Sequence, residues 1–62
     1  MMIRILVVTK QHSKTIEVEA VPRIGEAVTV NQNGVNIIYG MVYAVEHFYN
    51  IGGFKEITVK VK

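Results

Sequence analysis

The sequence predicts a small all-β domain, and three observations support that prediction. Apolar and polar residues alternate in several short segments, which is the two-residue period of a half-buried strand. Turn-forming residues separate these segments, including Asn33-Gly34, a strong short-range signal for a hairpin. No segment shows the apolar spacing of an amphipathic helix. In a chain of 62 residues these features predict one domain spanning residues 1–62.

The first two strands are predicted over residues 2–9 and 15–20. In the first, Ile3, Ile5 and Val7 form one apolar face, and the opposite face is only partly polar. In the second, apolar residues alternate with Thr and Glu, as expected for a strand with one buried face. The polar residues 10–14 between the two strands predict a hairpin loop.

A turn and a third strand follow. Pro22 cannot donate a hydrogen bond to a ladder and Gly25 can adopt a positive φ, so this region is predicted to turn. The third strand is expected over residues 27–30, with Val28 and Val30 facing inward.

Residues 35–49 form the longest predicted strand, and Gly40 near its middle indicates a bend or bulge. A turn over residues 50–53 leads to a last strand that ends at residue 62. Five short strands, tight turns and one bent strand predict a five-stranded SH3-like barrel or a strongly bent antiparallel sheet. The connections are too short for a typical OB-fold.

A bulge is predicted in the second half of the long strand. Val42, Val45 and His47 do not follow a strict period of two. A single extra residue at Tyr43-Ala44 would place all three side chains on one face.

The composition restricts the class of protein. Half of the residues are hydrophobic, so a folded chain is expected. There is no cysteine, hence no disulfide or thiolate metal site to brace so small a fold, and such domains often gain stability by self-association. The N-terminal apolar run is too short to span a membrane and has no export pattern. We expect a cytoplasmic protein that does not bind membranes.

The residues that carry catalysis are scarce, and we expect no enzyme, cofactor or metal. The chain has no Asp or Cys, and its only serine, Ser13, is adjacent to His12 without a carboxylate to orient the imidazole. His47 is expected to be partly buried and hydrogen-bonded to the backbone, because a metal site would need more ligands. Gly52-Gly53 is expected to form a hairpin turn, since phosphate loops need further glycines and a following helix.

The long strand is the most informative segment for function. Before the bulge, Tyr39, Met41 and Tyr43 share one face, opposite the apolar Ile38 and Val42. A sheet with one solvated side should carry polar residues there. Two explanations stay open: a loop covers the outer face, or that face is buried against another subunit or a ligand.

The candidate contact residues for a ligand or partner lie in this region and just after it. They are aromatic or cationic side chains that could stack on rings or hold an anion. The set is Tyr39, Tyr43, His47, Phe48, Tyr49, Phe54 and Lys55. For Lys60 and Lys62 two roles are considered: protection of a sheet edge, which we favour, and binding of an anion.

Two motifs resemble those of short, uncharacterised SH3-like β-barrel proteins encoded by bacteria and their phages. One is Pro22–Val28, with the pattern Pro-x-x-Gly-Glu-x-Val. The other is Val42-x-x-Val45-Glu46-His47, followed by the alternating apolar residues of the last strand. The resemblance covers about residues 20–62. It implies a small barrel and a bacterial or phage setting, without catalytic residues or a particular ligand.

These observations lead us to expect a non-enzymatic, homo-oligomeric binding module. Its ligand would be a protein partner or a small anion such as a nucleotide. A nucleic-acid-binding barrel and a structural or assembly accessory protein are the alternatives. The net charge of +2 permits an anionic partner without requiring one.

Overall fold

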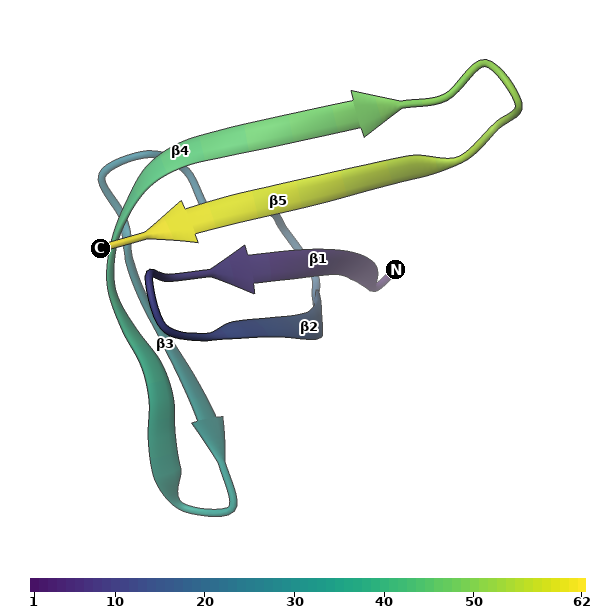
Figure 1. Cartoon of the computed structure of the whole chain (residues 1–62). Helices are drawn as coiled ribbons and strands as arrows, with labels where there is room; N and C mark the ends of the chain where they lie inside the picture. The colour runs from purple at the N-terminus through teal and green to yellow at the C-terminus, as the bar shows by residue number, and fades with distance from the viewer.

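The structure is a computed structural model that describes residues 1–62 and consists of one curled β-sheet (Figure 1). The strands are β1 (Ile3–Val8), β2 (Ser13–Val18), β3 (Ala27–Gln32), β4 (Val35–Tyr49) and β5 (Lys55–Val61). Their order in the sheet is β2-β1-β5-β4-β3, and the sheet bends into a half-barrel. The predicted all-β class with five strands is therefore confirmed. No helix long and apolar enough to cross a membrane is present.

Three of the four strand pairings are antiparallel, and β1 with β5 is parallel. The parallel pairing is short, with Leu6 opposite Thr58, Val7 opposite Val59 and Val8 opposite Lys60. The sheet is thus mixed. Because parallel strands run in the same direction, the C-terminal ends of β1 and β5 lie at the same end of the sheet.

The bend in β4 occurs at Gly40, as predicted. Residues up to Met41 pair with β3, and residues from Val42 onward pair with β5. Gly40 has a φ of 151°, a backbone angle that residues with a side chain rarely adopt. A Cβ atom there would lie 2.5 Å from the carbonyl oxygen of Lys62. Because glycine stands at the bend, one continuous strand can pair with β3 before the bend and with β5 after it.

The predicted bulge is also present. Val42 pairs with Val61, whereas Ala44 pairs with Lys60, so Tyr43 is the extra residue. Downstream of it, the partners of Val45 and His47 lie on the same face of β5 as the partner of Val42. The bulge keeps apolar residues of β4 directed into the curl on both sides of the bend.

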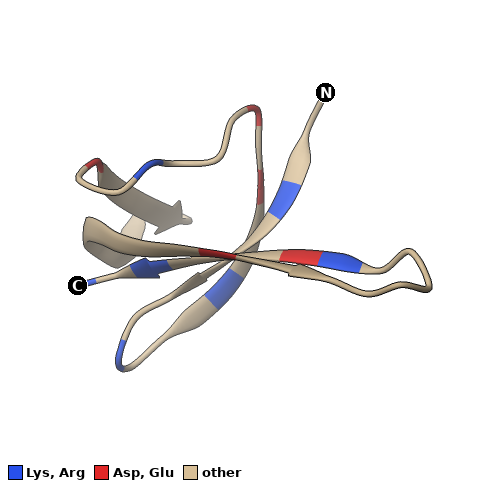
Figure 2. Ribbon diagram, turned by 90° about the horizontal axis from the view of Figure 1, so that it is seen from above, with Lys and Arg blue, Asp and Glu red and all other residues tan.

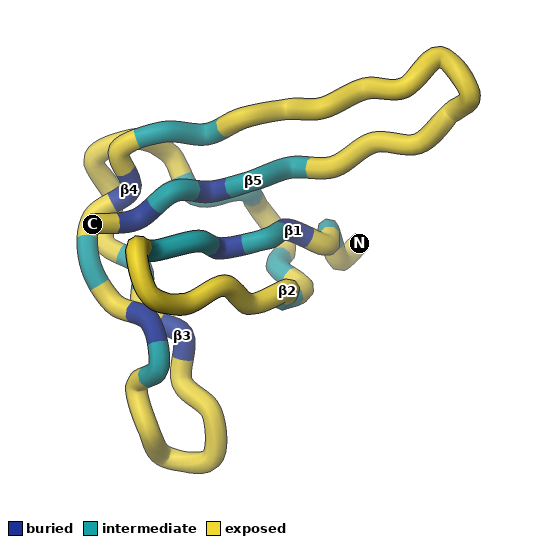
Figure 3. Tube along the Cα trace, in the orientation of Figure 1, coloured by how far each residue is buried: buried dark blue, intermediate teal, exposed yellow.

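The hydrophobic core is small and lies inside the curl (Figure 3). Seven residues are buried: Ile5, Val7, Val30, Ile38, Val42, Val59 and Val61. Every strand except β2 contributes to this set, and β2 adds half-buried side chains that pack against it. The inward residues predicted for the first and third strands are confirmed, with Val28 half-buried.

The second strand differs from the prediction, because it begins at Ser13 and ends at Val18. Val18 pairs with Ile3, the first residue of β1, and Met1 and Met2 before it lie outside the sheet, so the ladder ends there. Ala20 is consequently exposed and outside the sheet, and the prediction that the strand reaches it was wrong. The hairpin loop is also displaced, because it covers residues 9–12 rather than 10–14.

The turn predicted at Asn33-Gly34 is confirmed. Both residues have positive φ, 54° and 85°, as required by the two-residue hairpin turn that matches strand twist. The side chain of Asn31 braces the turn: its Oδ1 accepts a hydrogen bond from the Gly34 N–H, and its Nδ2 donates to Asn36 Oδ1.

Candidate binding surfaces

The seven candidate residues lie in two separate regions of the surface. Tyr39 and Tyr43 lie on the outer face of β4 around the bend. The other five lie on the end of the β4–β5 hairpin, where residues 46–56 project beyond the rest of the sheet (Figures 1 and 3). We call this segment the aromatic arm. Its side chains divide between two opposite faces, so the rings do not form a single stacking platform.

The outer face of β4 is not covered by any loop. Tyr39 is 71% exposed, and Met41 and Tyr43 are about half exposed. The explanation that a loop shields this face was therefore wrong, because the only long connection, residues 19–26, crosses elsewhere. The ammonium of Lys62 lies 5.3 Å from the centroid of the Tyr43 ring, which is within the range of a cation–π interaction.

The aromatic arm carries rings on both of its faces. Phe48 and Phe54 contact edge to face with centroids 5.9 Å apart. On the opposite face the rings of His47 and Tyr49 are stacked at 6.2 Å. All four are exposed, and Ile51 at the tip is fully exposed. An antiparallel ribbon in water would place polar residues on at least one face.

His47 differs from its predicted environment. It is exposed and packs on Tyr49, so the expectation of a partly buried histidine was wrong. The register places it opposite Ile57, on the inward-facing side of the ribbon. At His47 this side of the ribbon lies beyond the buried core, because β1 pairs with β5 only at residues 58–60.

The Gly52-Gly53 pair forms the hairpin turn at the tip of the arm, as predicted. The N–H of Asn50 donates to Phe54 O and that of Gly53 donates to Asn50 O. The side chain of Asn50 accepts a hydrogen bond from the Gly52 N–H at 2.7 Å. Lys55 follows the turn and pairs with Tyr49 across the ribbon.

The role favoured for the C-terminal lysines, protection of a sheet edge, was wrong for Lys60. Its strand, β5, lies between β1 and β4, whereas the edges of the sheet are β2 and β3. Lys60 forms an ion pair with Glu46 of the neighbouring strand, with Nζ 3.2 Å from Oε2. Both side chains are substantially exposed, so this pair is worth at most about 1 kcal/mol.

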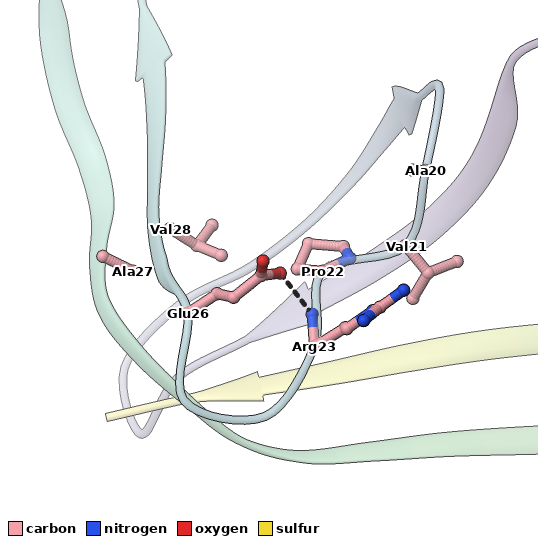
Figure 4. Close-up of a pocket in the computed structure, with 7 residues that line it drawn as sticks. All are labelled: Ala20, Val21, Pro22, Arg23, Glu26, Ala27 and Val28. Atoms are coloured by element: carbon pink, nitrogen blue, oxygen red, sulfur yellow. Dashed lines mark hydrogen bonds between the residues drawn. The ribbon is translucent and has the colours of Figure 1, made fainter.

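Two hollows of comparable size lie outside the arm. One, of about 700 Å³, lies beneath the connection between β2 and β3 (Figure 4). There Glu26 folds back and its Oε1 accepts a hydrogen bond from the Arg23 N–H at 2.6 Å. The carboxylate is thereby occupied by its own loop, which closes the turn predicted around Gly25.

The other hollow, of about 560 Å³, lies between the β1–β2 loop, the first half of β4 and the end of β5. Lys10, His12, Asn36 and Lys62 contribute to its lining, together with Tyr39. Of these, Tyr39 is one of the seven predicted contact residues, and binding of an anion was the less favoured of the two roles considered for Lys62. Lys10, Asn36 and Lys62 are at least 26 positions apart along the chain, so no local pattern relates them.

The β1–β2 loop at this second hollow is held by Thr9. Its Oγ1 accepts hydrogen bonds from the N–H groups of Gln11 and His12, and its hydroxyl donates to His12 O at 3.3 Å. We expect Thr9→Val to cost about 1 kcal/mol of unfolding free energy, because these bonds are lost while the β-branched shape is retained. Urea denaturation would measure this cost, and amide hydrogen exchange should accelerate at Gln11 and His12. Unchanged exchange at both amides would contradict the bracing role.

No family model, curated protein or solved structure matches the chain. No group of three or more His, Cys, Asp or Glu side chains is placed to hold a metal ion. The exposed aromatic arm and the two hollows are therefore the features from which a function can be inferred.

Proposed function

We propose that this protein is a non-enzymatic binding module that assembles with copies of itself through its aromatic arm. The observation that carries the proposal is an excess of exposed surface. The accessible surface area is 4838 Å² for a mass of 7.0 kDa. A compact folded monomer of that mass exposes about 4,000 Å².

The excess, about 800 Å², equals the area that one partner typically buries in a stable protein interface. The shape of the molecule agrees with this comparison. Its radius of gyration is 11.8 Å and its longest extent is 37 Å. A compact domain of this length has a radius of gyration of about 10.6 Å. The projecting hairpins account for the difference (Figure 1).

The arm has the chemistry expected of the surface that a second copy would cover. Isolated two-stranded ribbons are marginally stable in water, and this one carries exposed aromatic rings on both faces. Both outer strand edges of the arm are also free, since β3 pairs with β4 only as far as Met41 and β1 pairs with β5 only at residues 58–60. A core of seven buried side chains leaves little stability of its own, and covering the arm would add to it.

Sedimentation velocity at micromolar concentration should show a dimer or a larger assembly. Phe48→Ser and Phe54→Ser are each expected to weaken association at least tenfold, because a buried Phe contributes about 1.5–3 kcal/mol. Val35→Ser is the matched control, since Val35 is 61% exposed at the tip of the other hairpin. A monomer at all concentrations, or equal effects of all three variants, would contradict assembly through the arm.

A further inference from the structure

The parallel pairing of β1 and β5 brings together two lysines that are far apart in the sequence. Lys10 follows the end of β1, and Lys62 follows the end of β5. Both line the hollow of about 560 Å³ described above. Binding sites for small molecules have volumes of about 300–1,000 Å³, so this hollow is large enough for a small organic ligand.

The charge around this hollow has one sign. Its ten lining residues include two lysines and no Asp or Glu. Of the acidic residues, Glu17 lies opposite Arg4 in the strand register at the far end of the β1–β2 hairpin, and Glu46 forms an ion pair with Lys60. Figure 2 shows blue segments at the loop of this hairpin and at the C-terminus, with red segments elsewhere. An anion approaching this end meets a positive potential.

The same hollow offers neutral hydrogen-bond donors beside the charges. The Asn36 side chain uses its Oδ1 to accept from Asn31, which leaves its amide group free to donate. Tyr39 is exposed, and its hydroxyl can donate as well. His12 sits on a loop that Thr9 holds in place, and because its backbone N–H is already donated to Thr9 Oγ1, only its imidazole ring can donate to a ligand. Donors fixed before binding lower the entropic cost of holding a ligand.

We propose that this hollow is a binding site for a small organic anion that carries a phosphate or carboxylate group. The anionic group would contact the ammonium of Lys10 and the donors of Asn36 and Tyr39. The apolar part of the ligand would lie against the half-buried Ile37, which lines the same hollow. Lys62 contributes mainly through its charge, since its ammonium rests on the Tyr43 ring. The site deepens the proposed binding function but does not require assembly through the arm.

The test uses the whole protein, labelled with ¹⁵N, and two probes: inorganic phosphate and phenyl phosphate at constant ionic strength. Saturable amide shifts are expected at Lys10, His12, Asn36 and Tyr39. Phenyl phosphate should bind several-fold more tightly, because its ring adds buried apolar area. Lys10→Gln should weaken binding of both probes roughly three- to tenfold, as expected for loss of one charge-assisted contact at an exposed site.

Lys55→Gln is the matched control, because it removes the same charge from the aromatic arm and should leave both affinities unchanged. Absence of saturable shifts, or equal effects of the two lysine variants, would overturn the site. Saturable shifts from either phosphate probe that centre on the aromatic arm rather than on the hollow would overturn it as well.

Sedimentation of the same samples separates this inference from the proposed assembly. An oligomer that fails to bind phosphate overturns only the anion site. A monomer that binds phosphate at Lys10 supports the site and overturns only the assembly.

Discussion

Replacing Gly40 by Val is expected to leave the protein largely unfolded at room temperature. Two costs combine at this position. The φ of 151° is unfavourable for any residue other than glycine, and this backbone strain costs about 1–3 kcal/mol. A Cβ would also lie 2.5 Å from the oxygen and 2.9 Å from the carbonyl carbon of Lys62, and overpacking of this kind costs about 1–3 kcal/mol more.

The atoms in the way belong to the backbone, so no rotamer change can relieve the contact. They also belong to a hydrogen-bonded pair: Met41 N–H donates to Lys62 O at 2.9 Å, and Lys62 N–H donates to Met41 O at 3.0 Å. Movement of Lys62 away from a new Cβ would break these bonds. A domain of this size seldom has more than about 3–5 kcal/mol of stability, so the combined cost is comparable with the whole.

Gly34→Ala is the matched control for this prediction. Gly34 also has a positive φ, 85°, but a Cβ there meets no atom within 4 Å. Only conformational strain remains, and we expect a loss of about 1 kcal/mol. Urea denaturation of both variants at one protein concentration, followed by circular dichroism, gives the comparison. Equal losses for the two glycines would show that close packing at the bend is unimportant.

The local features of the fold could be predicted from the sequence because they depend on neighbouring residues. Gly40, the Asn33-Gly34 turn and the bulge at Tyr43 each leave a local signature, either a permissive residue or a break in the period of two. The direction of pairing between β1 and β5 leaves none. Both strands alternate in the same way whether they run parallel or antiparallel, since the period of side chains is the same in both.

The positions of surface residues could likewise be predicted only where they depend on neighbouring residues. Alternation correctly assigned Tyr39 and Tyr43 to the face opposite Ile38 and Val42. It could not show how far the hairpin extends beyond its neighbours, and for this reason His47 was expected to be partly buried. The hollow near Lys10 was missed entirely, because it depends on the parallel pairing that brings the end of β5 beside the β1–β2 loop.

Ile38→Ala is expected to produce the second large loss of stability. Ile38 is 1% exposed and is one of the two largest fully buried side chains. It lies opposite Val30 and belongs to the core cluster, so it packs the β3–β4 hairpin against the rest of the core. Truncation of a buried Ile to Ala costs about 2–5 kcal/mol, with the larger values where the cavity cannot collapse. Backbone ladders on both sides of the bend in β4 limit collapse here.

Tyr39→Ala tests the same strand one residue further along, on the opposite face. Tyr39 is 71% exposed, and we expect its loss to change the unfolding free energy by no more than about 0.5 kcal/mol. Denaturation of both variants at one low protein concentration compares the two faces directly. If Tyr39→Ala is destabilising there, the outer face contributes to the monomer fold. If it is neutral, Tyr39→Ala is folded, and a change in its affinity for phosphate would report on the proposed anion site and not on unfolding.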